Sequence, residues 1–172
     1  MPVRVTVGDV FESEADGLVL SIDGLRSGME GQVARAFAQR WPEAWRWVEQ
    51  GVEYPLELGQ AQCVVLDEAH GCPFEAVILV STLHHLDVLG AGQKQRLVSK
   101  ATTNAVKAAV THQFEAVATT VMSGGWRLSM DQALVGMMAG FKASLPQSRG
   151  VWLDIHGLDP QLKAIARRLG LP

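Results

Sequence analysis

Apolar and polar positions along the chain switch repeatedly between a period of two and a period near 3.6. The segment "VRVTV" alternates like a strand, and "GLVLSI" is apolar throughout, as in a strand buried on both faces. Four later segments have the same character: "AQCVVLD", "AVILVST", "AVATTVM" and "VWLDI". We therefore expect six strands spread along the chain.

Helical spacing separates most of these strands. Apolar residues recur at helical spacing over about 29–50, where Pro42 predicts a break between two helices. Two further helices are expected over about 93–113 and 130–145. The last one, "DPQLKAIARRLG", has Asp159 as its expected N-cap.

The resulting order, β-β-α-β-β-α-β-α-β-α, predicts one α/β domain over residues 1–172. Its sheet is expected to be mixed but mainly parallel, in a three-layer α-β-α arrangement. Such sheets bind ligands beyond the carboxyl ends of their strands. The loops that leave those ends are therefore the ones in which to seek chemistry.

Composition narrows the classes of partner. The 172 residues are 48% hydrophobic and 19% charged, with a net charge of −3 and no Lys/Arg block. We expect no nucleic-acid partner and no membrane span, because no apolar run approaches ~20 residues. The start of the chain has no signal-peptide pattern, and Cys63 and Cys72 fit no zinc spacing. A cytoplasmic protein with reduced thiols is expected.

Two glycine-bearing loops each lie between a strand and a helix. They are "SIDGLRSGMEGQV" and "MSGGWRLSM". Side by side, they would direct backbone N–H groups and two helix N-termini into one space, which suits a diphosphate. Each loop alone also has a plain explanation, because glycines before a helix often serve turn geometry.

The element order and these loops resemble the macro domain family, a fold that binds ADP-ribose. Gly8-Asp9 in "VTVGDVF" matches the family's Gly-Asp pair, and "ADGLVLSID" matches its "DAIVNAAN" segment. The segments "SGMEGQV" and "SGGWRLS" occupy the places of the family's two glycine loops.

The resemblance implies a ligand, ADP-ribose or a related nucleotide, held between the two loops. Asp9 would accept from the adenine amino group, Asp23 would bind the ribose, and the loop N–H groups and Arg127 would hold the diphosphate. No cofactor and no metal is expected. The ligand-binding residues implied are Asp9, Val10, Ile22, Asp23, Gly28, Gly31, Val33, Ser123, Gly124, Gly125, Trp126 and Arg127.

Several positions depart from the family pattern. Leu20 and Asp23 stand where the family has asparagines, and Glu30 lies in the first glycine loop. Ala34 follows the loop valine, where ester-hydrolysing members carry an aspartate, which disfavours that route of hydrolysis. Ester hydrolysis with Asp23 or Glu30 as base is therefore the least supported activity.

These departures favour an alternative function, a degenerate macro-like domain that acts as a structural or protein-interaction unit. Its partner, or a second copy of the chain, would bind the tryptophan-rich helix with Trp41, Trp45 and Trp47. Asp9 has an alternative role too, because an Asp after a strand often caps nearby N–H groups.

The pair His84-His85 is expected to be ordinary, because adjacent strand residues point to opposite faces and cannot easily hold one metal ion.

Overall fold

A computed structural model describes residues 2–28, 31–123, 127–145 and 150–172. Their order matches the predicted one, with the expected break in the first helical stretch and with two short 3-10 turns in addition. The elements are β1 (Val3–Val7), η1 (Val10–Glu12), β2 (Gly17–Asp23), α1 (Gln32–Arg40), α2 (Pro42–Gly51), β3 (Ala61–Val65), η2 (Glu68–His70), β4 (Ala76–Leu83), α3 (Ala91–Thr111), β5 (Ala116–Thr120), α4 (Met130–Ser144), β6 (Trp152–Gly157) and α5 (Gln161–Arg168).

The strands form one six-stranded sheet in the order β1-β6-β5-β2-β4-β3. All neighbours pair in parallel except β3, which runs antiparallel to β4 at one edge. The prediction of a mixed, mainly parallel sheet is confirmed. Because the other five strands run the same way, their carboxyl ends meet at one edge of the sheet.

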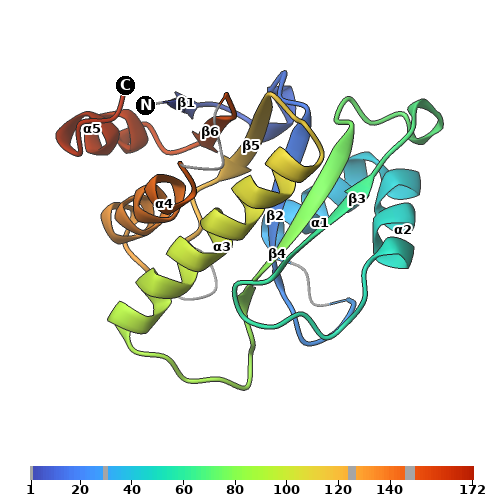
Figure 1. The fold of residues 1–172 in the computed structure, drawn as a ribbon, viewed down its shortest axis with the longest axis horizontal. Helices are drawn as coiled ribbons and strands as arrows, with labels where there is room; N and C mark the ends of the chain where they lie inside the picture. Colours follow the sequence, from blue (N-terminus) through green and yellow to red (C-terminus); the bar gives the residue numbers. More distant parts are fainter. Residues whose placement is uncertain (1, 29–30, 124–126, 146–149) are drawn as a thin grey trace.

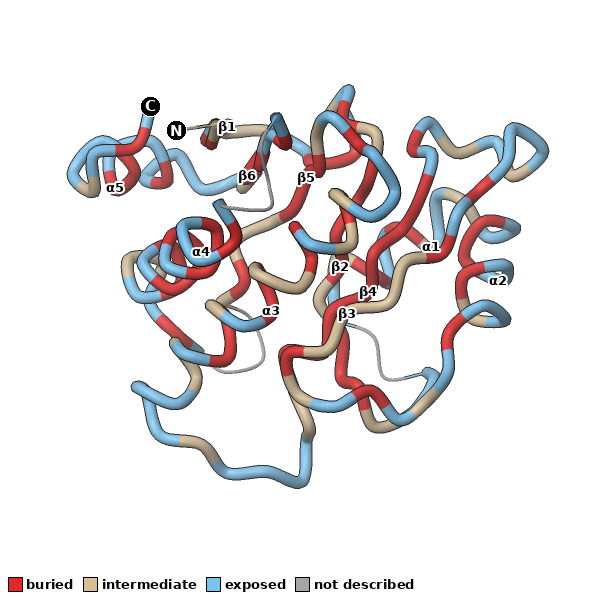
Figure 2. The backbone as a smooth tube through the Cα atoms, in the orientation of Figure 1, coloured by how far each residue is buried: buried red, intermediate tan, exposed pale blue. Residues whose placement is uncertain are grey.

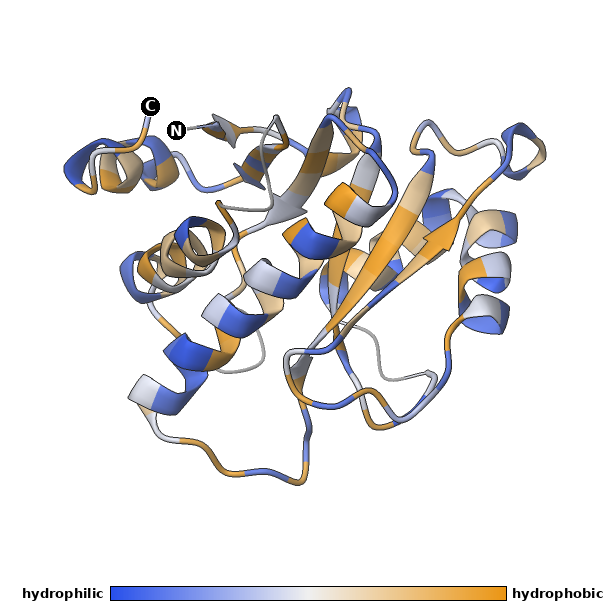
Figure 3. Cartoon of the chain, in the orientation of Figure 1, coloured by the Kyte–Doolittle hydropathy of each residue, from blue (hydrophilic) through white to orange (hydrophobic). Residues whose placement is uncertain are grey.

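Helices cover both faces of the sheet. Figure 1 shows α3 and α4 together on the near face, with α1 and α2 toward the far side and α5 beside α4. The buried residues follow the strands and the inward sides of these helices in Figure 2. In Figure 3, β4 is hydrophobic along most of its length, because seven of its eight residues are buried between the two helix layers.

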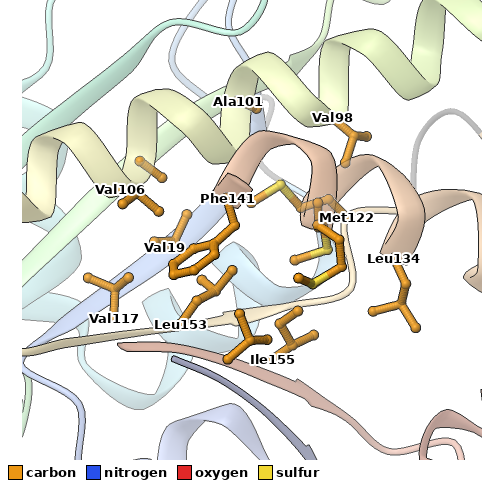
Figure 4. Packing of buried hydrophobic residues seen from close by; sticks show 14 of the residues in the cluster. Val19, Val98, Ala101, Val106, Val117, Met122, Leu134, Phe141, Leu153 and Ile155 are labelled. Atoms are coloured by element: carbon orange, nitrogen blue, oxygen red, sulfur yellow. The ribbon is translucent and has the colours of Figure 1, made fainter. Parts of the chain in front are cut away.

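Each face has its own core. Under α3 and α4 the core contains Met137 and Phe141 of α4 together with strand residues. Figure 4 shows Phe141 directed toward Val19, Leu153 and Ile155 of the strands. On the opposite face a second cluster is formed mainly by β2, η1, α1 and α2. The three-layer architecture is therefore built from two hydrophobic cores with the sheet between them.

The predicted boundaries agree closely with the observed ones. The break at Pro42 is confirmed, because α2 begins there and Trp41 lies between the two helices. Pro160 is the N-cap of α5, but the Asp159 carboxylate still accepts a hydrogen bond from the N–H of Gln161. Asp159 thus bonds a helix N–H as predicted, although the helix begins one residue later than expected.

The helices α3 and α4 approach closely because α4 presents two glycines to α3. A Cβ built on Gly140 would lie 2.1 Å from the carbonyl oxygen of Ser99, and one on Gly136 would lie 2.9 Å from that of Gln95. A backbone atom cannot move aside as a flexible side chain can. Both positions therefore exclude any larger residue.

Gly140→Ala should destabilise the protein by about 1–3 kcal/mol, despite the gain of about 1 kcal/mol in helix propensity. Gly92→Ala in α3 is the matched control, because its Cβ would meet only the end of the Arg96 side chain, at 3.6 Å. Urea unfolding measures both. A Gly140→Ala variant as stable as Gly92→Ala would contradict this packing.

A polar patch interrupts the apolar pattern between β1 and β6. Arg4 donates to the buried Asp154 carboxylate through Nε at 3.0 Å and Nη2 at 2.5 Å, which raises the pKa of the guanidinium. His156 lies two residues beyond Asp154 in β6, on the same face of the sheet, and is 7% exposed. Within the described part of the chain, its Nδ1 is buried without a hydrogen-bond partner.

Burial lowers the pKa of His156 below its usual 6.5, an effect that the nearby carboxylates of Asp154 and Asp9 oppose. The unfolded chain then binds a proton more readily than the folded one. Stability contributed by the neutral imidazole is fully present above pH 6.5 and falls as the pH drops below it.

His156→Phe should therefore lose less stability than the wild type between pH 7.5 and pH 5. Denaturant unfolding at the two pH values measures the difference. Identical losses in both proteins would show that His156 does not titrate differently in the folded and unfolded states.

Candidate functional site

The candidate site lies at the carboxyl ends of the parallel strands. Four loops of the expected chemistry leave this edge: residues 8–9 after β1, 24–31 after β2, 84–90 after β4 and 121–129 after β5. The sheet order places β2 between β5 and β4. The β2 loop is therefore flanked by the loops of both neighbours.

Asp9 is the N-cap of η1. Its Oδ1 accepts a hydrogen bond from the N–H of Phe11 at 2.9 Å, which confirms the capping role that the sequence left open. Its Oδ2 lies 3.6 Å from Nη1 of Arg40, whose Nη2 contacts Glu12 at 2.9 Å. The Asp9 side chain remains 45% exposed. A ligand amine could reach it, in competition with Arg40.

Three of the expected ligand residues are mainly apolar supports. Val10 and Ile22 are buried in the core beneath η1 and α1, and Val33 in the first turn of α1 is half-buried against the same core. Their side chains fix the positions of the loops on either side.

Asp23 ends β2 with a buried carboxylate that already has three hydrogen bonds. Oδ1 accepts from the N–H of Leu25 at 3.0 Å, and Oδ2 accepts from the N–H of His85 at 2.9 Å. Oδ2 also lies 2.8 Å from Nδ1 of the His85 ring. The side chain is 2% exposed. Direct contact with a ribose stays a prediction, and it would require one of these bonds to yield.

The loop after β2 leads to an open helix N-terminus. Gly28 is exposed with a φ of +83°, a conformation that favours glycine. Gly31 is the N-cap of α1 and has no side chain with which to cap the helix. Counting only the residues that the structure describes, the first N–H groups of α1 therefore have no side-chain acceptor from the N-cap. Met29 and Glu30 lie outside the described residues.

The loop after β5 is described only at its two sides. The N–H of Leu128 donates to the carbonyl of Ser123 at 3.3 Å, so these two described residues lie close together. Arg127 is exposed with a φ of +53°, uncommon for a residue other than glycine. The expected ligand residues Gly124, Gly125 and Trp126 lie outside the described part.

The two helix N-termini are not equivalent. The hydroxyl of Ser129 accepts from the N–H of Gln132, and the Gln132 side chain accepts from the N–H of Ser129. This capping box satisfies donors at the start of α4, whereas the N-cap of α1 supplies no such acceptor from any described side chain. Of the two, α1 is the better placed to bind an anion.

Two histidine environments were missed by reasoning from the sequence. His85 was expected to be an ordinary loop residue, yet it is hydrogen-bonded to Asp23. His156 lies beside the Gly8-Asp9 turn, because Gly8 donates to the carbonyl of Gly157 at 3.0 Å. The sequence held one signal for the Asp23–His85 hydrogen bond: a carboxylate, Asp23, stands at the end of β2 where the family has an asparagine.

The tryptophan-rich helix contributes mostly to the core. Trp45 is buried and Trp41 is half-buried among Phe11, Phe37 and Phe74. Trp47 alone of the three is exposed, at 48%, and its indole N–H donates to the carbonyl of Val65. A partner surface on this helix stays a prediction that depends on Trp47.

The cysteines, the possible metal ligands and the helix lengths bear on what else the described residues could do. Cys63 and Cys72 are free thiols, and burial raises the pKa of Cys63 to about 11. Among the described residues, no three His, Cys, Asp or Glu side chains are grouped to hold a metal ion. No described helix is long and apolar enough to cross a membrane.

A cavity of about 390 Å³ lies at the opposite end of the sheet, at the start of β5 and β6. Its lining includes Phe114, Gly150 and Trp152. None of the expected ligand-binding residues that the structure describes lines it.

No protein-family model and no curated protein matches the sequence, whereas solved structures do. A macrodomain from Oceanobacillus iheyensis superposes with a TM-score of 0.79 and 14% identity over 96% of this chain and 89% of that one. A Trypanosoma brucei macrodomain in complex with ADP-ribose gives 0.78 and 12%, over 98% and 69%. An alphavirus P23pro-zbd structure gives 0.71 and 20%, and this chain covers 23% of it. The chain therefore has the macrodomain fold, as its element order predicted.

Proposed function

We propose that the carboxyl edge of the sheet binds ADP-ribose or a related nucleotide. The observation that carries the proposal is the open N-terminus of α1 at Gly31, placed directly beyond the central strand β2 of a macrodomain sheet. A helix N-terminus without a side-chain cap is suited to a phosphate group. The T. brucei neighbour was solved with ADP-ribose, which supports this ligand class.

The base would lie against the turn after β1. Asp9 offers an exposed carboxylate that can accept from an exocyclic amine, with Val10 buried behind it. His156 lies next to this turn with an unpartnered ring nitrogen, again counting only the described residues. A nucleobase edge could supply the missing partner.

The diphosphate would lie between the loops after β2 and β5. The N–H groups that follow Gly31, including that of Val33, are its first donors, and Gly28 allows the loop to turn toward it. Ser123, Gly124, Gly125, Trp126 and Arg127 would form the second wall. Arg127 adds a positive charge to a site whose other ionisable groups are mainly carboxylates.

The terminal ribose would lie near the end of β2. Ile22 and Asp23 close this part of the site from below, and Asp23 acts there through His85 rather than through an exposed oxygen. Position 34 in α1 is a buried alanine, which has no carboxyl group, so α1 supplies no acid there.

The base contact can be tested with two aspartates that have the same local role. Asp9→Asn should weaken ADP-ribose binding about tenfold or more, since a hydrogen bond to a charged group contributes about 1.5–3 kcal/mol. Asp67 caps η2 as Asp9 caps η1, but η2 precedes the amino end of β4, away from the proposed site. Asp67→Asn should therefore bind ADP-ribose as the wild type does. Calorimetric titration, with AMP as a second ligand, measures both. Equal affinities of the two variants would remove Asp9 from the site.

Charge at the start of α1 should separate binding from stability. A Cβ on Gly31 would make only an ordinary contact, 3.5 Å from the carbonyl of Ser21, so Ser and Asp both fit and both cap the helix. Gly31→Asp should bind ADP-ribose at least about tenfold more weakly than Gly31→Ser, because its carboxylate repels the diphosphate. Thermal unfolding should show both variants to be at least as stable as the wild type. Equal affinities would place the phosphates elsewhere.

A second function is supported by a specific observation. Asp9 is paired with Arg40 and Asp23 is buried, so both expected ligand carboxylates already have partners within the chain. A domain without ligand that works as a structural or protein-interaction unit would have this arrangement. Absence of binding to ADP-ribose and to AMP at millimolar concentration would favour it.

A further inference from the structure

The strand β3 forms one lateral edge of the sheet. On one side it pairs with β4, and in the described part of the chain no strand pairs with its other side. The N–H of Leu66 donates to the carbonyl of Glu75 at 2.8 Å. Because the direction of these groups alternates along a strand, the even-numbered residues of β3 face β4. The N–H and C=O groups of the odd-numbered residues therefore point away from β4, at Ala61, Cys63 and Val65.

This edge carries none of the devices that usually keep a free strand from pairing. Natural edge strands are commonly blocked by charged residues, by proline or by a bulge. The segment "QAQCVVL" over residues 60–66 has no charge and no proline, and its register with β4 is regular over 61–65. Val65 is 52% exposed. Another extended chain could therefore pair with β3.

An exposed tryptophan lies beside this edge. The indole N–H of Trp47 donates to the outward-pointing carbonyl of Val65 at 3.0 Å, so α2 holds the ring against the free side of β3. Figure 1 shows α2 next to this strand. The Trp47 ring lies 5.2 Å from that of His70, between centroids, and the residue is still 48% exposed. An apolar side chain of a chain paired with β3 would cover it.

The side of the edge that faces α3 is basic. The helix α3 has no carboxylate and four cations, Lys94, Arg96, Lys100 and Lys107. Lys100 lies over Gly59, where a built Cβ would be 2.5 Å from its Cδ, and its Nζ donates to the carbonyl of Leu58. Lys107 is exposed and lies two turns later on the same side of the helix.

Lys107 is level with the middle of β3. The helix connects the parallel strands β4 and β5 and runs back along them, so it has the same direction as β3. Asn104 donates to the carbonyl of Gly59 at 2.7 Å, which places Gly59 beside residues 100–104. Lys107 follows by about 5–10 Å, a distance that corresponds to about two or three strand residues.

We propose that the free edge of β3 binds an extended acidic segment of another protein, which adds a strand to the sheet. Carboxylates on one face of that strand would lie beside Lys100 and Lys107, and apolar side chains on its other face would cover Trp47. This inference gives a chemistry to the partner of the second function proposed above. It is independent of the nucleotide site, which lies at the carboxyl edge of the sheet.

A second copy of the chain does not have this complementarity. Antiparallel pairing of two β3 edges would place both α3 helices on the same face of the joined sheet, next to each other. Lys100 and Lys107 of one copy would then face the same cations of the other. An acidic partner neutralises this charge, whereas a second copy doubles it.

Calorimetric titration with the end-capped peptide Glu-Val-Glu-Ile-Glu-Val-Glu tests the charge preference. It should bind saturably, and at least about tenfold more tightly than Lys-Val-Lys-Ile-Lys-Val-Lys. Lys107→Glu should weaken binding of the acidic peptide by about fivefold or more. Lys163→Glu is the matched control, because this exposed lysine lies in α5, which packs near β1 at the opposite edge of the sheet. It should bind the peptide as the wild type does.

Methylation of the peptide amides tests strand pairing. In an added strand, alternate N–H groups face β3 and the others face solvent. N-methylation of one alternate set should abolish binding, and N-methylation of the other set should preserve it. Backbone amide NMR of the protein should show the largest shifts at residues 61–65.

Equal effects of the two methylated sets, or equal affinity for the acidic and basic peptides, would overturn the proposal. A dimer of the free protein that the acidic peptide dissociates would assign the edge to a second copy and overturn it as well. Lys107→Glu should bind ADP-ribose as the wild type does, so loss of peptide binding and loss of nucleotide binding are measured separately.

Discussion

The buried carboxylate of Asp23 fixes the geometry on which the candidate site depends. A charge that is 2% exposed is tolerated only when it is hydrogen-bonded, and here the donors come from two different loops, at Leu25 and His85. The end of β2 and the loop after β4 are therefore held together by one side chain. Removing its charge would leave these donors without a charged acceptor, and both loops would lose their anchor.

The fold places Asp23 at the carboxyl edge of the sheet, where ligands bind in folds of this type. Five strands run in parallel and end at one edge, so the loops after β1, β2, β4 and β5 surround the same space. The two cores on either face keep the sheet rigid beneath them. In the proposed function, the start of α1 would bind the phosphates and the turn at Asp9 would accept from the base.

Sequence reasoning predicted the architecture well because strand and helix periods, Pro42 and the apolar runs are local signals. The glycine loops and Asp9 were proposed as ligand-binding residues from local motifs and from the resemblance to the macro domain family, and their role in binding stays a prediction. Sequence reasoning could not find the Asp23–His85 pair, since 62 residues separate the partners and only the β2–β4 register brings them together. Nor could it foresee that Arg40 would face Asp9, because that contact depends on how α1 packs over η1.

The central claim is that the carboxyl edge of the sheet is the ligand site. The most direct measurement is an NMR titration of backbone amides with ADP-ribose. We predict saturable shifts at residues 8–10, at residues 32–33 and at Arg127, with little change at Gln113 and at residues 150–152 around the opposite cavity. Shifts confined to that cavity, or none at millimolar ligand, would contradict it.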